Sequence, residues 1–326
     1  MPTFCRHNRF VENCPICSKQ ERPRASAAPS ARRSPSGSAG SPATPKRPAR
    51  ARRTSGDLRV RRVARAADDG YVSELVPGLR ASDDARRLAA EIAFSVARLD
   101  ELHDDPPGLL ADVALADDRE DALWLAFLIA YLSPLEGDDP WASIRALRTR
   151  WADGELPDPD AADLGPRTAH TAGRGTQTLA AYRAWAGRGG TQAAALAGEE
   201  AWTPQRRFDR AFERLALPGL ARAGRYEFLV LCSWLGLADL AAGSLLLSEP
   251  TDPAMLAAKR VFGMGDALIL RRRSADLAEA LAVPIDALDL ALVNWALPPG
   301  SPRVTAGSRA QGDPDVVARH AAVLDA

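Results

Sequence analysis

The sequence predicts an all-α protein. Apolar residues recur every three or four positions in residues 83–103, the spacing of an amphipathic helix. An uninterrupted apolar run from Ala122 to Leu132 has the length and composition of a helix buried on most sides. Alternating strand patterns are almost absent. At 326 residues and 46% apolar content, the chain has room for one or two globular domains.

The helices are expected in the following order. In the first, the apolar stripe consists of Leu88, Ile92, Val96 and Leu99, and Asp83 or Asp84 is available as its N-cap. The second contains the apolar run and ends near Pro134. Further segments bring the total to about eight to ten short helices: "WASIRALRTRWADG", "TLAAYRAWAGRGG", "QRRFDRAFERLAL", "YEFLVLCSWLGLADL", "PAMLAAKRVFG", "RSADLAEALAV" and "PIDALDLALVNWAL". The helical domain is expected over residues 67–300. The tail, residues 301–326, can form one more short helix.

The zero net charge conceals a division along the chain. Residues 1–66 hold 16 Lys and Arg against 3 acids, and the rest holds 26 against 39, so the two parts carry about +13 and about −13. A basic arm releases counterions along a polyphosphate, so DNA is the partner we expect first. An anionic membrane surface, or a solvated linker attracted by the acidic body, are the alternatives. Residues 19–66, rich in Pro, Ser, Ala and Arg, are expected to form a disordered linker.

The first 18 residues contain a cluster of metal-ligating side chains. Cys5, His7, Cys14 and Cys17 supply three thiolates and one imidazole, the count of a closed tetrahedral Zn²⁺ site. So short a segment cannot fold by burial alone, so metal binding would supply the folding energy. We therefore expect a zinc knuckle over residues 1–18 with a structural zinc ion. A redox or catalytic thiol, or four unligated residues, are the alternatives.

The chain is expected to be cytoplasmic. Its start lacks the continuous apolar segment of a signal peptide. The best membrane-span candidate, 228–247, is interrupted by Gly236, Asp239 and Gly243, which suits buried helices better than lipid. No membrane partner is expected.

Residues 206–231, "RRFDRAFERLALPGLARAGRYEFLVL", predict two helices joined by a Leu-Pro-Gly-Leu turn at 217–220. This is the arrangement of a helix-hairpin-helix element, whose turn presents backbone N–H groups to a phosphate. Ala221 replaces the usual second glycine, and arginines surround the turn. An ordinary helix-helix turn is the alternative. The loop "RTAHTAGRGTQT", 167–178, with His170 and Arg174, is either a second anion site or a plain connection.

Together with "TLAAYRAWAGRGGTQ" and "AAKRVFGMGDALILRRRSADLAEA", these segments resemble the alpha-glutamyl/putrescinyl thymine pyrophosphorylases, a helical family related to DNA glycosylases. The opening "FCRHNRFVENCPIC" resembles the zinc-binding head of an actinobacterial branch of that family. The resemblance covers about residues 80–300 and the head. It implies a DNA glycosylase-like helical domain that acts on a phosphorylated 5-hydroxymethyluracil in DNA. An amine or amino acid attacks this base, and pyrophosphate leaves.

Such a substitution needs cations for pyrophosphate, a proton acceptor for the amine and a flat partner for an extruded base. The candidate phosphate-binding residues are Arg174, Gly175, Arg183, Arg206, Arg207, Arg210, Gly219, Arg225 and Lys259. Candidates for the proton acceptor are Glu227 and Asp266. Candidates for the flat partner are Tyr182, Trp185 and Tyr226. Exposed arginines are more commonly solvated or paired with neighbouring acids, and Tyr182 with Trp185 can instead form one core stripe.

Two other activities are less consistent with the sequence. The turn Gly263–Gly265 does not follow a strand and lacks a third glycine, which argues against a dinucleotide fold. In glycosylases of the helix-hairpin-helix type an aspartate follows the hairpin glycine by about twenty residues, as Asp239 does here, but its surroundings are apolar. Besides the enzyme, a non-catalytic DNA-binding module with zinc and a zinc-mediated protein-interaction factor stay open. The enzyme requires guanidinium groups beside the hairpin to converge on one pocket.

Overall fold

The computed structural model describes residues 66–326, which lie in a single unit and form helices joined by turns. The all-α prediction is confirmed for these residues, which include no strand. The helices are α1 (Ser82–Asp104), α2 (Leu109–Ala114), α3 (Arg119–Leu132), α4 (Ala142–Leu147), the 3₁₀ helix η2 (Pro159–Ala161), α5 (Gly175–Arg188), α6 (Gln192–Ala197), α7 (Pro204–Arg214), α8 (Arg222–Trp234), α9 (Pro253–Phe262), α10 (Ala267–Leu281), α11 (Ala287–Ala296) and α12 (Pro314–Leu324).

Every segment predicted to be helical contains a helix. The described part has twelve α-helices where eight to ten were expected, because α2 and α6, of six residues each, are too short to show a periodic pattern. The helix expected in the C-terminal tail is α12, which packs against α1. The predicted zinc knuckle, residues 1–18, and residues 19–65 of the predicted linker lie outside the described residues.

The start of α1 differs from the prediction. Asp83 and Asp84 lie in its first turn, and neither caps it. Instead, the Asp69 carboxylate accepts hydrogen bonds from the Ser82 backbone N–H (3.1 Å) and from the Ser82 hydroxyl (2.6 Å). The preceding loop brings this carboxylate to the helix end, where unpaired N–H groups favour an acceptor.

Helix α3 is the centre of the core, as predicted. All residues from Ala122 to Leu132 are buried. The Asp118 side chain caps the helix by accepting from the Glu120 N–H at 2.9 Å. Around α3 pack α2, α4, α6 and α8, and the ring of Phe127 stacks on that of Tyr182 with centroids 3.6 Å apart.

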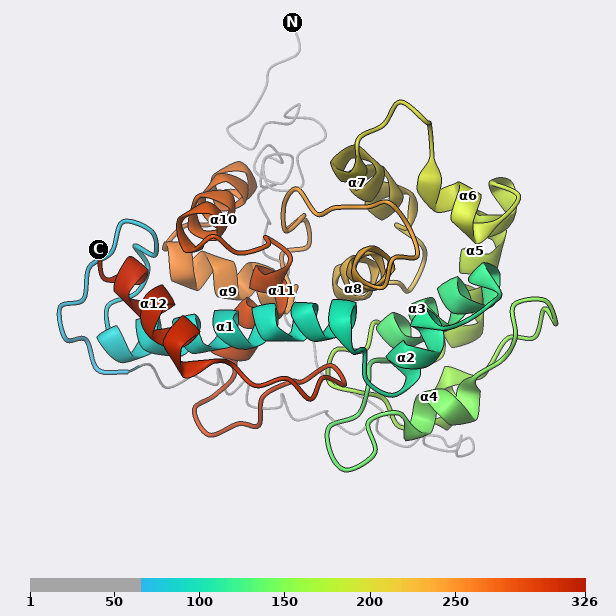
Figure 1. Cartoon of the computed structure of the whole chain (residues 1–326), viewed down its shortest axis with the longest axis horizontal. Helices are drawn as coiled ribbons and strands as arrows, with labels where there is room; N and C mark the ends of the chain where they lie inside the picture. The colour runs from blue at the N-terminus through green and yellow to red at the C-terminus, as the bar shows by residue number, and fades with distance from the viewer. Residues whose placement is uncertain (1–65) are drawn as a thin grey trace, which may run out of the picture. The chain divides into compact units, whose positions relative to one another are not determined.

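Figure 1 shows α1 crossing the view, with α9 to α12 gathered around one part of it and α2 to α7 beyond its other end. Helix α8 lies between the two groups and packs against α1, α3 and α7. The loop before α5 and the start of α8 reach α11 of the first group, because Arg167 and Arg222 both pair with Asp289. Within residues 66–326, no helix is both long and apolar enough to cross a bilayer.

Candidate functional site

Several charged side chains are buried where the two groups of helices meet. Arg98, Arg222, Asp252 and Asp289 are each at most 6% exposed. Burying a charge is costly unless an opposite charge and hydrogen bonds compensate it. Such a concentration of buried charge therefore needs a specific arrangement of partners.

Asp289, on α11, is the centre of this arrangement. Its carboxylate accepts hydrogen bonds from Arg167 at 2.6 Å and from Arg222. Burial alone would raise the pKa of Asp289, but the guanidinium groups of Arg222 and Arg167 outweigh it and hold the pKa below its usual range. Asp289 is therefore ionised and fixes the orientation of both arginines.

Glu227, on α8, extends the network. One carboxylate oxygen pairs with Arg98 of α1, and the other lies 3.5 Å from Arg167. Both oxygens thus face guanidinium groups. Glu227 thus lies between two guanidinium groups, and its predicted role as a catalytic base stays a prediction.

The loop that carries Arg167 is held against the end of α3. The Thr168 hydroxyl donates to the Tyr131 carbonyl at 3.0 Å. The Tyr131 hydroxyl lies 2.8 Å from His170 Nδ1, and His170 Nε2 lies 2.9 Å from Asp160. Since both ring nitrogens are engaged, His170 secures the loop.

A cavity of about 210 Å³ lies beside the network. It is lined by Pro166, Arg167, Thr168, Ala221, Arg222, Ala223, Glu249, Thr251, Asp252, Pro253, Ala254 and Val293. No side chain caps the start of α8, so its first N–H groups and the positive end of its dipole border the cavity at Ala221 to Ala223. The Nε of Arg222 is buried without a hydrogen-bond partner among the described residues. Backbone N–H donors at the start of α8 thus border the cavity, and the buried charge of Arg222 lies beside it.

A carboxylate lines the same cavity. Asp252 caps α9 by accepting from the Met255 N–H at 3.1 Å, and it lies 3.6 Å from Arg222. Burial raises the pKa of Asp252 above its ordinary value, although the nearby Arg222 opposes the shift. A buried carboxyl group whose pKa is raised is suited to accept a proton. Asp239, which follows the hairpin glycine at the spacing of the glycosylase aspartate, is exposed and pairs with Arg207 on the surface.

Residues 165–301 match the family model of alpha-glutamyl/putrescinyl thymine pyrophosphorylase clade 3. All twelve residues that line the cavity fall within this matched segment. The resemblance expected from the sequence is thereby confirmed over this segment. No curated protein and no solved structure matches the chain.

Several other predicted site residues lie apart from the cavity. Along α7, Arg206 covers the Trp202 ring, Arg207 pairs with Asp239, and Arg210 pairs with Glu213 at 2.8 Å. These three do not line the cavity, so the expected convergence on one pocket does not include them. Two further candidates are on other helices: Lys259 lies on α9, and Asp266 caps α10 by accepting from the Leu268 N–H at 3.0 Å.

The hairpin turn contacts the start of α5. The Thr178 hydroxyl donates to the Pro218 carbonyl at 2.8 Å, and Gly219, with φ of +77°, lies against Thr178 and Arg174. The predicted residues Arg174, Gly175 and Gly219 are thus brought together. Whether this turn binds a phosphate stays a prediction.

The aromatic candidates are core residues in this conformation. Tyr182 is fully buried, and its hydroxyl donates to Gln192 at 2.7 Å. Tyr226 is equally buried, and its hydroxyl donates to the Ser244 carbonyl at 3.2 Å. Neither ring has a face open to an extruded base.

Two of the predicted arginines are held by other groups. Arg183 donates to the Trp151 carbonyl and lies over the Trp151 ring at 4.0 Å from its centre. Arg225 is buried and pairs at 2.5 Å with Glu249, which lines the cavity.

Sequence reasoning missed Arg167, Asp252 and Asp289. Two of them carried a readable signal. Asp252 precedes Pro253, the pattern of an N-cap followed by proline in the first turn. Asp289 is the one acid in a mostly apolar helix, which indicates a buried partner. Arg167 begins the loop 167–178 that was considered as an anion site, but it was not singled out there, since its partners come from distant parts of the chain.

Proposed function

We propose that the protein modifies a thymine-derived base in DNA, with an amine displacing pyrophosphate from a phosphorylated 5-hydroxymethyluracil. The match of residues 165–301 to the thymine pyrophosphorylase family supports this activity. The observation that carries the proposal is the cavity within that segment, where anion donors face a buried carboxyl group.

In the reaction, the amine nitrogen forms a bond to the methylene carbon of the base. The bond between that carbon and the pyrophosphate oxygen breaks, and pyrophosphate leaves with the bonding electrons. The developing charge on the leaving group would be stabilised by Arg167, Arg222 and the free N–H groups at the start of α8. The two guanidinium groups are fixed beforehand by Asp289, so little reorganisation is needed.

The attacking amine must lose a proton. Asp252 lines the cavity and has a pKa raised by burial, so it is the proton acceptor that this geometry favours. Glu227 would keep Arg167 in position. Asp252 thus replaces Glu227 and Asp266 as the proposed base.

The test uses the full chain and duplex DNA that carries 5-hydroxymethyluracil pyrophosphate. With glutamate or putrescine added, we expect pyrophosphate release and a DNA mass increase that matches the attached amine. Absence of release with either amine, combined with equal affinity for modified and plain DNA, would reject the enzyme. Strong but base-independent DNA binding would instead favour the non-catalytic DNA-binding module.

The N-terminal residues enter the proposal separately. A structural zinc ion held by Cys5, His7, Cys14 and Cys17 would fold the first 18 residues into an accessory unit. The basic segment that follows would add salt-dependent affinity for DNA.

A further inference from the structure

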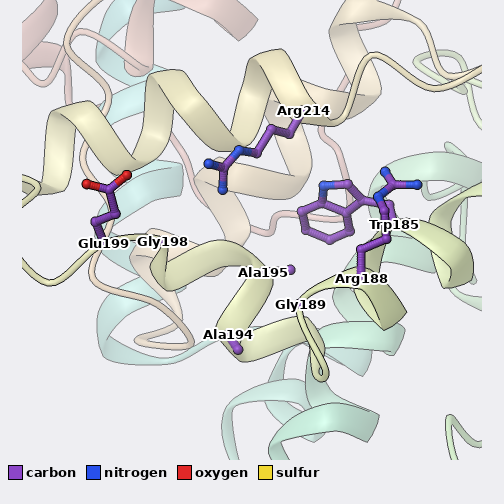
Figure 2. Close-up of a pocket in the computed structure, with 8 residues that line it drawn as sticks. All are labelled: Trp185, Arg188, Gly189, Ala194, Ala195, Gly198, Glu199 and Arg214. Atoms are coloured by element: carbon purple, nitrogen blue, oxygen red, sulfur yellow. The ribbon is translucent and has the colours of Figure 1, made fainter.

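A second hollow, of about 530 Å³, lies between α5, α6 and α7. Its lining residues are Trp185, Arg188, Gly189, Ala194, Ala195, Gly198, Glu199 and Arg214. In the view of Figure 2, the Trp185 indole lies between the side chains of Arg214 and Arg188, and Glu199 lies at the opposite end. No residue is shared with the cavity at Asp252.

Small residues leave this hollow open. Gly189 at the end of α5, Ala194 and Ala195 on α6 and Gly198 at the end of α6 line it, and none has a side chain larger than a methyl group. Gly198 has φ of +63°, and a Cβ there would meet the Trp202 ring at 2.5 Å. A glycine is therefore required for the chain to turn away at this point.

Arg188 and Arg214 line the hollow, and Arg206 lies over the same Trp202 ring as Arg214; within residues 66–326 these arginines have no carboxylate partner. Among the ion pairs of residues 66–326, none includes Arg188, Arg206 or Arg214. The guanidinium groups of Arg206 and Arg214 each lie within 5.3 Å of the centre of the Trp202 ring. The only acid in the lining is Glu199. The hollow therefore presents unpaired guanidinium groups to solvent.

We propose that this hollow binds backbone phosphates of a DNA strand. Arginine guanidinium groups bind phosphate oxygens through paired, charge-assisted hydrogen bonds. The hollow is much larger than one phosphate group needs, and its cations come from two separate helices, which suits an extended sugar-phosphate chain better than a single small anion. The inference rests on the proposed function only in taking DNA as the polymer.

The test measures binding of plain duplex DNA by the full chain as a function of salt. Each phosphate contact contributes about 0.9 to the slope of log K against log salt. The double variant Arg188→Gln/Arg214→Gln should therefore reduce the slope by about 1.8, with weaker binding at every salt concentration. Arg319→Gln is the matched control, since Arg319 is also exposed and unpaired in the described residues but lies on α12. The basic N-terminal segment is identical in all variants.

Two further variants separate the effect from misfolding. Removing the acid of the lining, by Glu199→Gln, should strengthen DNA binding about two- to threefold, a gain that damage to the fold would not give. Adding an acid at an exposed lining position, by Ala194→Glu, should weaken it by a similar factor.

Three results would overturn the proposal. The double variant could keep the slope of the native chain. Free pyrophosphate could displace DNA from the native chain but not from the double variant, which would make the hollow a site for the small anion. The native chain could also fail to bind plain DNA at low salt. Because no turnover is measured, an inactive enzyme with a normal salt effect would reject only the proposed function.

Discussion

Replacing Asp289 by Asn tests whether the buried ion pairs hold the site together. Asp289 is 2% exposed, and its carboxylate is shared by Arg167 and Arg222. Asparagine keeps the shape of the side chain but removes the charge. The substitution therefore leaves two buried guanidinium groups without their common counter-charge.

Removal of one partner from a buried ion pair costs about 3–5 kcal/mol of folding free energy. Here part of the loss can be recovered, because Arg167 lies 3.5 Å from Glu227 and Arg222 lies 3.6 Å from Asp252. We therefore expect Asp289→Asn to lower the free energy of unfolding by the lower end of this range, about 3 kcal/mol. A domain is typically stable by only about 5–15 kcal/mol, so this loss is large.

Urea denaturation of the full chain, followed by circular dichroism and tryptophan fluorescence, measures the change. Asp83→Asn is the control: Asp83 pairs with Arg86 on the surface, its side chain is 78% exposed, and its loss should cost less than about 1 kcal/mol. If Asp289→Asn costs no more than this control, the network does not stabilise the fold and the reasoning is wrong.

The same variant has a pH signature. Because the pKa of Asp289 is lowered in the folded chain, its stabilisation is present above the unfolded value of about 3.9 and is lost as the pH falls through the folded value. The native chain should lose stability faster than Asp289→Asn in this acid range. Parallel acid profiles would contradict the assignment of an ionised Asp289.

Three other outcomes are expected. Gly219→Ala should lower the melting temperature more than Gly236→Ala does. Both glycines have positive φ, but only at Gly219 would a Cβ overlap the Thr178 hydroxyl. Equal losses would contradict this reasoning. Asp252 must be ionised to accept a proton, and burial raises its pKa above the ordinary value of about 3.9, so turnover should already fall at a pH above that value. Asp252→Asn should slow turnover about 10²- to 10⁴-fold, and an unchanged rate would exclude Asp252 as the base. Metal analysis should find one zinc ion per chain, lost in Cys14→Ser, and its absence from the native chain would reject the knuckle.

The sequence predicted the fold better than it predicted the site. A helix leaves a periodic local pattern, so the stripe from Leu88 to Leu99 and the run from Ala122 to Leu132 could be recognised directly. The cap of α1 could not, because its acceptor, Asp69, lies thirteen positions away on a loop.

The site depends on contacts that are distant in sequence. Arg167 and Asp289 are separated by 122 positions, and Arg98 and Glu227 by 129. Neither pair leaves a local trace. The arginines of α7 were prominent in the sequence because they are clustered, yet clustering on an amphipathic helix identifies its solvent face as readily as a binding site.

The hairpin connects the two sites. Arg214 ends α7 beside the larger hollow, and Ala221, seven positions later, borders the cavity at the start of α8. Seven residues span at most about 25 Å, so the borders of the two sites at Arg214 and Ala221 lie within that distance of one another. A DNA strand advances about 3.4 Å per nucleotide, so about seven nucleotides cover it. The turn held by Gly219 and Thr178 therefore sets how a strand bound at the hollow would be aligned with a base in the cavity.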